Sequence, residues 1–220
     1  MVDPVLLAAI ESEGRRLIAA ARLDPGRRVP QYPNWTLADL AAHTGSVHAL
    51  ATKVVDTRAT ERVTRPTLPE GRDALDWADQ KLTQLISVFR YADPDVPVWG
   101  FGDGSTVAHW VRRMLVETGV HRWDAQHTIG ETGPLADLVA STGLDEFSDM
   151  WFPLMTDPTT LQVRATDLDR TWTYGDGPPA HTVEGSASDL YLALMTRPSP
   201  VTLPEEWAVA CATLPPPPDI

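Results

Sequence analysis

Apolar residues in the first 130 positions recur at the three- and four-residue spacing of amphipathic helices. A first helix is predicted at residues 4–22, with Asp3 placed to cap it. A second is predicted at about 37–57, because Thr36 and Asp39 have the spacing of a capping box. The remaining helices of this part are predicted at residues 71–91 and from Ser105 or Thr106 to about residue 128, with loops at 24–35 and 92–104.

After Pro134 the pattern changes from helical to alternating. One more helix is predicted at about 135–151, and short alternating runs then indicate strands. We therefore predict an α+β protein, with a four-helix bundle at residues 1–132 and a smaller α+β domain at 133–220. The elements expected in the second part are strands at 161–165, 171–174 and 181–184, a helix at about 186–196 and a proline-rich tail at 214–220.

Charge and cysteine content restrict the expected partners and compartment. The net charge is −12, with 30 acidic residues against 18 basic ones, which repels phosphate backbones and argues against nucleic-acid binding. The lone cysteine, Cys211, cannot form an internal disulfide. Since no apolar run approaches the roughly 20 residues that span a bilayer and no signal peptide is evident, we expect a cytoplasmic protein without membrane contact. A monomer is the favoured oligomeric state. The basic residues are nearly all arginine, which is typical of a high-GC bacterium.

Two histidines fall on the apolar faces of the predicted helices. His43 lies between Leu40 and Val47 in the second helix. In the fourth helix, Glu117 and His121 are four residues apart and share the apolar face. The other four histidines are expected to lie away from these faces: His48, His109, His127 and His181. Of these, His48 in particular is expected to be solvated.

A divalent metal would account for a carboxylate buried beside two imidazoles. An unpaired buried carboxylate is costly, and two histidines with one glutamate form a ligand set for catalytic zinc with an open fourth position. Nickel and manganese accept the same donors. The alternatives from the residues alone are a hydrogen-bonded core histidine, a surface Glu–His pair, and an ion pair of Glu117 with Arg113, four residues before it.

The same segments resemble a known family. The strings VPQYPNWTLADLAAHTGSVHAL (29–50) and VRRMLVETGVHRWDAQ (111–126) are similar to those of mycothiol-dependent maleylpyruvate isomerases, within the DinB-like superfamily of four-helix metalloproteins. The resemblance covers about residues 5–130. It implies that the metal is held by His43, Glu117 and His121, the residues that periodicity also selects.

The resemblance also has implications for the cofactor and the second domain. It implies use of the small thiol mycothiol together with a small electrophilic substrate. The segment 171–198 resembles part of a sterol-carrier-like domain, in which Arg197 matches a commonly basic position. The alternative for Arg197 is that it interacts with the C-terminal end of a helix. Here the domain is short, so its contribution to a site is left open.

Three functions are compatible with such a site. The favoured one is an isomerase or S-transferase in which the metal presents an external thiolate to the electrophile, with no catalytic side chain assigned and Cys211 idle. The alternatives are a hydrolase using metal-bound water and a non-catalytic binding or regulatory module. Asp124 and Arg113 are second-tier candidates, as support for a ligand or contacts to substrate, and Trp35 and Trp123 are expected to pack the bundle.

Overall fold

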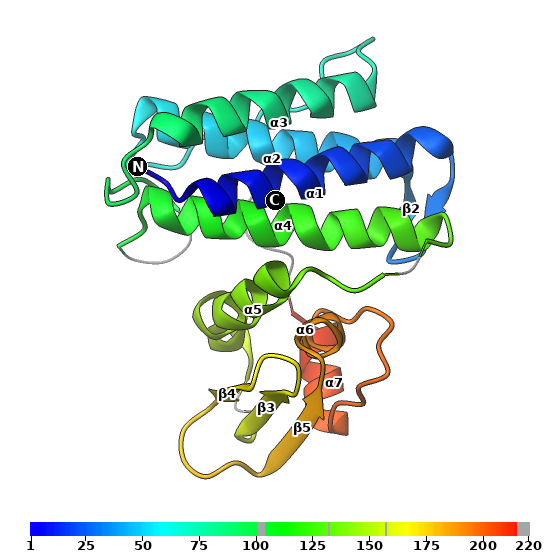
Figure 1. The fold of residues 1–220 in the computed structure, drawn as a ribbon, viewed down its shortest axis with the longest axis vertical. Helices are drawn as coiled ribbons and strands as arrows, with labels where there is room; N and C mark the ends of the chain where they lie inside the picture. Colours follow the sequence, from blue (N-terminus) through cyan, green and yellow to red (C-terminus); the bar gives the residue numbers. More distant parts are fainter. Residues whose placement is uncertain (101–103, 132, 157, 215–220) are drawn as a thin grey trace. The chain divides into compact units, whose positions relative to one another are not determined.

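The computed structural model describes residues 1–100, 104–131, 133–156 and 158–214 and divides into two compact units (Figure 1). The first unit comprises Met1–Gly133, and the second begins at Pro134. The proline-rich tail predicted at 214–220 lies outside the described residues from position 215, as do positions 101–103 of the predicted loop at 92–104. None of the helices in these described ranges is long and apolar enough to cross a membrane.

Long helices build the first unit, as the apolar spacing predicts. In Figure 1 they lie along one another in colours from blue to green, and α2 packs against both α3 and α4. Their buried faces supply a core that includes Leu17, Leu40, Phe89 and Trp110. The helices are α1 (Pro4–Leu23), α2 (Leu37–Thr57), α3 (Ala74–Tyr91) and α4 (Val107–Thr128).

Side-chain caps determine where these helices begin. The Asp3 carboxylate accepts from the amide of Val5 at 2.8 Å, as predicted. Helix α3 begins three residues after the predicted start at 71, because the Asp73 carboxylate accepts from the amides of Leu75 and Asp76. At α4, Thr106 is the cap, and the His109 ring accepts from its amide at 3.1 Å.

The predicted loop at 24–35 contains a β-hairpin instead. Strand β1 (Arg28–Val29) pairs antiparallel with β2 (Tyr32–Thr36). Thr36 ends β2 and also caps α2: its hydroxyl accepts from the amide of Asp39 at 3.2 Å, and the Asp39 carboxylate accepts from the amide of Thr36 at 2.8 Å. This confirms the capping box. The hairpin escaped prediction because a two-residue strand beside proline and glycine leaves no alternating pattern.

The second unit is a small α+β fold. Strand β3 lies in the middle of its sheet, antiparallel to β4 and parallel to β5. The predicted turn after β4 is present, with positive φ at Gly175 and Gly177. The elements are α5 (Asp137–Glu146), β3 (Leu161–Ala165), β4 (Arg170–Tyr174), β5 (His181–Gly185), α6 (Ala187–Leu194) and α7 (Glu205–Ala212).

The helices expected in the second unit need two corrections. The helix predicted at 135–151 is α-helical only to Glu146 and continues as a π-helical turn, Phe147–Trp151, followed by a 3-10 turn, Phe152–Leu154. A proline at position 153 is incompatible with a further regular turn. Helix α7 was not predicted, because it is short and follows a proline-rich stretch. Its Trp207 is fully buried and donates to the carbonyl of Thr159 at 3.0 Å.

Candidate metal centre

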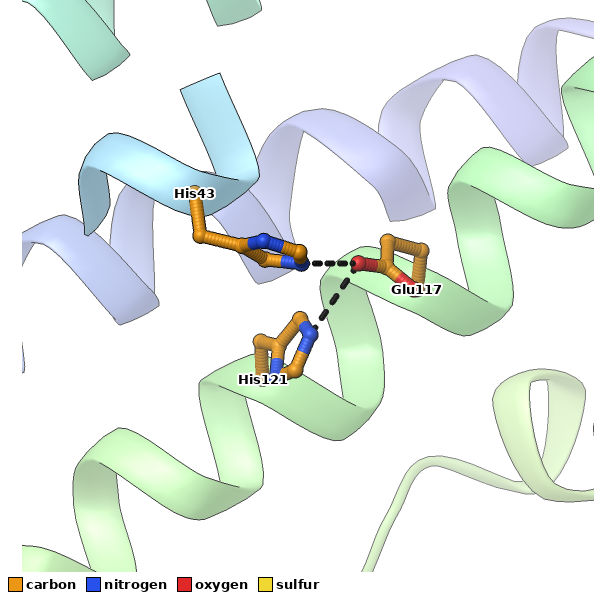
Figure 2. A group of neighbouring side chains, drawn as sticks. All are labelled: His43, Glu117 and His121. Atoms are coloured by element: carbon orange, nitrogen blue, oxygen red, sulfur yellow. Dashed lines mark hydrogen bonds and ion pairs between the residues drawn. The ribbon is translucent and has the colours of Figure 1, made fainter. Parts of the chain in front are cut away.

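Three side chains from α2 and α4 meet inside the first unit (Figure 2). The Nε2 atom of His43 lies 3.1 Å from Oε1 of Glu117, and Nε2 of His121 lies 3.0 Å from the same oxygen. The ligating atoms of all three lie within 4.8 Å of one another. Their side chains are nearly inaccessible, with 11% of His43, 5% of Glu117 and 6% of His121 exposed. The residues selected by periodicity therefore form one compact cluster.

Helix geometry explains this convergence. Glu117 and His121 are four residues apart and so project from neighbouring turns of α4 toward α2. His43 lies seven residues beyond the Thr36 cap, about two turns into α2. The rings of His43 and His121 meet edge to face, with centroids 5.1 Å apart.

Arg113 and the two imidazoles share Glu117 between them. The Arg113 guanidinium pairs with Oε2 of Glu117, while Oε1 faces both histidines. The ion pair of Glu117 with Arg113, an alternative to the metal site in the sequence analysis, is thus present together with the histidine cluster. Burial would raise the pKa of Glu117, but Arg113, His121 and the hydrogen bonds from both imidazoles hold it well below its ordinary value. Glu117 is therefore an anion at neutral pH.

Asp124 fixes the orientation of His121 from the other side of the ring. Its Oδ2 lies 3.0 Å from Nδ1 of His121, and its side chain is fully buried. Burial opposes protonation of His121, but the charge of Glu117, together with Tyr32 and Asp124, raises the pKa of His121 to about 10. The surroundings of this ring therefore favour positive charge, which a metal cation would also supply.

Aromatic side chains of the β1–β2 hairpin contact both histidines. Tyr32 and Trp35 stack with ring centroids 4.7 Å apart. The Trp35 ring lies 4.8 Å from that of His43, and the Tyr32 ring lies 5.8 Å from that of His121. Trp35 is half-buried, so it lines the site as well as packing against the helix. Tyr32 was not singled out from the sequence, although it lies in the quoted string at 29–50.

The expectation that His48 is solvated is wrong. His48 is buried, and its Nε2 lies 2.8 Å from the hydroxyl of Thr118. Burial lowers the pKa of His48 to about 4, so the ring is neutral at physiological pH. The prediction fails because every residue at positions 44–51 is buried, so the middle of α2 has no solvated face.

Of the other residues singled out from the sequence, His109 and His127 lie on α4, and His181 and Arg197 belong to the second unit. His109 is exposed and its ring accepts from the amide of Thr106, the cap of α4, and His127 stacks on the buried Trp123 at 4.7 Å. His181, on β5, lies 3.5 Å from a carboxylate oxygen of Glu206. In the second unit Arg197 donates to the carbonyl of Met195 at 2.8 Å, a contact at the end of α6.

Cys211 has the surroundings of an unreactive thiol. It lies on α7 with 5% of its surface exposed. Burial raises the pKa of the Cys211 thiol to about 12. Because the thiolate is the nucleophilic form, this side chain is inert at neutral pH, as the sequence predicts.

Comparison with known proteins gives one family and one fold. The profile of the mycothiol maleylpyruvate isomerase N-terminal domain matches residues 7–126, which is more than half of the chain. No curated protein matches the sequence significantly.

Two solved structures resemble the whole chain. A crystal structure of the mycothiol-dependent maleylpyruvate isomerase matches with a TM-score of 0.64 at 14% identity, covering 91% of this chain and 94% of that one. A histidine-to-alanine mutant of a mycothiol-dependent maleylpyruvate isomerase matches with a TM-score of 0.67 at 13% identity and the same coverage. At this identity the likeness establishes the α+β fold.

Proposed function

Because the chain belongs to the family of the mycothiol maleylpyruvate isomerase N-terminal domain, we propose that it is a metal-dependent enzyme acting with a small thiol. The metal is held by His43, Glu117 and His121. The thiol is mycothiol or a close relative, and the reaction is isomerisation of, or S-transfer to, a small electrophilic substrate. The observation that carries the proposal is the convergence of two imidazoles on one anionic carboxylate oxygen inside the bundle.

The donor set fits a divalent cation. Zinc bonds of about 2.0–2.2 Å place neighbouring donors roughly 3–3.5 Å apart, so the contacts of 3.0 and 3.1 Å require only small adjustments. Asp124 adds the contact expected behind a metal-bound histidine, since a carboxylate on Nδ1 leaves Nε2 as the donor. Zinc is the metal that this set favours, and nickel or manganese would also be accepted.

The nucleophile must come from outside the protein. The chain has one cysteine, and its thiol is buried with a raised pKa. A divalent metal at the cluster would convert a bound thiol to its thiolate near neutral pH. Addition of that thiolate to an activated double bond forms a C–S bond and leaves a single C–C bond free to rotate. Loss of the thiolate completes an isomerisation, whereas protonation of the carbon completes a transfer.

The protein side chains prepare the site for this chemistry. Arg113 fixes one oxygen of Glu117 and directs the other toward the histidines. Asp124 holds the ring of His121. Tyr32 and Trp35 provide apolar surface beside both imidazoles, which limits access of water and strengthens the electrostatic interactions within the site.

Substitution of Glu117 tests the metal. Glu117→Gln keeps the shape and helix propensity but removes the anionic charge, so most bound metal should be lost while the fold survives. The measurement is metal stoichiometry by mass spectrometry after reconstitution with zinc, with circular dichroism as the folding control. Glu131→Gln, a change of the same kind at an exposed position, should keep full metal content.

Two results would contradict the proposal. Near-zero metal in the wild type after reconstitution with zinc, nickel or manganese would contradict both the metal site and the metal-dependent activity. Equal stoichiometry in wild type and Glu117→Gln would remove Glu117 from the ligand set. For the thiol, isothermal titration of zinc-loaded protein with mycothiol should show binding that is lost in metal-free protein, and turnover that proceeds without thiol would favour a hydrolase.

A further inference from the structure

Arg65 carries a buried hydrogen-bond donor that finds no partner among the described residues. It lies in the irregular segment at 58–73 that joins α2 to α3. Its Nη1 atom is shielded from solvent and has no hydrogen-bond partner anywhere in the described part of the chain. Buried guanidinium groups are normally paired, because an unsatisfied charged donor is costly. A bound ligand with a hydrogen-bond acceptor would satisfy this donor.

The backbone of this segment is attached to α2 beside the metal centre. The hydroxyl of Ser46 donates to the carbonyl of Pro66, the residue that follows Arg65. Ser46 lies three residues after His43, so both project from the same side of α2. This hydrogen bond brings the segment that carries Arg65 against the side of α2 that carries His43.

The two arginines near the cluster differ in their partners. Arg113 is paired with Glu117, so its charge is compensated inside the site. Arg65 has no carboxylate partner among the residues that the structure describes. Within the described ranges, Arg65 is therefore a cation without a partner on the α2 side, where a carboxylate would gain both charge attraction and hydrogen bonds.

We propose that Arg65 is the substrate-binding residue that receives a carboxylate of the electrophile. The inference rests on the proposed function and deepens it by naming the residue that would hold the anionic group of the electrophile. The planar guanidinium matches a carboxylate with paired hydrogen bonds, which fixes direction as well as position. The thiol sulfur requires the metal, so the free cation is assigned to the second reactant.

The test is a titration of the full-length, ¹⁵N-labelled protein with succinate, followed by NMR. Succinate is an unreactive dicarboxylate, and succinamide is its neutral counterpart. Wild type should bind succinate, and Arg65→Gln should bind it at least about tenfold more weakly. Arg72→Gln, the same change at an exposed position of the same segment, should bind as wild type does. Succinamide should bind weakly to all of them.

Each titration is made with metal-free and with zinc-loaded protein, which separates this inference from the proposed function. Equal affinity of wild type and Arg65→Gln, or no binding of succinate by wild type, would overturn the role of Arg65. Binding that needs zinc and survives Arg65→Gln would place the carboxylate on the metal, which overturns the inference and leaves the proposed function intact. Failure of wild type to bind zinc would count against the proposed function, while the metal-free titration still decides on Arg65. Should Arg65→Gln misfold, Arg65→Lys keeps the charge without the planar fork and should bind succinate more weakly than wild type.

Discussion

Glu117 divides its two carboxylate oxygens between different partners. Arg113 occupies Oε2, so Oε1 alone faces the histidines. A carboxylate held in this way would bind a metal through one oxygen, which leaves more of the coordination sphere for a reactant. Arg113 also offsets part of the negative charge of the site, so we infer that it trades some metal affinity for a fixed geometry.

His48 should make stability depend on pH. Burial lowers its pKa from 6.5 to about 4. Because the folded-state pKa is below the unfolded one, the unfolded chain binds the proton first as pH falls. The stability associated with the neutral His48 ring is fully present above about pH 6.5 and is lost progressively down to pH 4. Between pH 7.5 and 5.0, protonation of His48 in the unfolded chain should therefore lower the free energy of unfolding by roughly 2 kcal/mol.

The check is urea denaturation of metal-free wild type and His48→Gln at both pH values. Gln can still bond to Thr118 but does not titrate, so the variant should lose about 2 kcal/mol less than wild type on acidification. Identical pH slopes for wild type and His48→Gln would show that the ring is not held neutral by burial.

The sequence predicted the cluster better than it predicted the individual side-chain environments. His43, Glu117 and His121 were found because helical spacing identifies residues that share a face. His48 was misplaced because the middle of α2 is buried all round, and periodicity cannot distinguish a buried face where no solvated one exists. Arg65 left no pattern, because it lies in an irregular segment between α2 and α3.

At the scale of elements, Thr36 joins the hairpin to the helix that carries His43. It is the last residue of β2 and the cap of α2, so one residue sets both where the hairpin ends and where the helix begins. The aromatic side chains of β2 and the imidazole of α2 are therefore held in a fixed relation, as their ring contacts indicate.

Removal of this cap should weaken the fold without removing the metal. Thr36→Ala deletes the hydroxyl that accepts from the amide of Asp39 and should cost about 1 kcal/mol of unfolding free energy. Metal stoichiometry should stay unchanged, since no donor atom is altered. Chemical denaturation and metal analysis check both parts, with Thr57→Ala in the last turn of α2 as the control. A loss of metal would mean that the hairpin positions His43.

Element boundaries were predictable where a cap or a breaker marks them. Thr36 and Asp3 gave the starts of α2 and α1, and the alternating runs gave β3, β4 and β5. The hairpin and α7 were missed because each is too short for periodicity to appear. The π-helical turn after α5 could not be predicted, since it keeps a helical pattern while changing the hydrogen-bond spacing.

At the scale of the whole molecule, the proposed metal donors all come from the first compact unit. That unit has its own buried core and its own capped helices. A chain ending at Gly133 should therefore fold and keep a zinc stoichiometry close to that of the full protein. Circular dichroism and metal analysis of residues 1–133 test this, and an unfolded or metal-free product would show that the centre depends on the second unit.

The inert thiol of Cys211 has a consequence for how such an enzyme ages. On the proposed function, the sulfur that reacts belongs to a small molecule, while the only sulfhydryl of the protein is buried and protonated. Oxidants and alkylating agents that attack thiols would then consume the diffusible reagent and leave Cys211 unmodified. Loss of that thiol would then be repaired by supplying another small molecule, without new synthesis of the polypeptide.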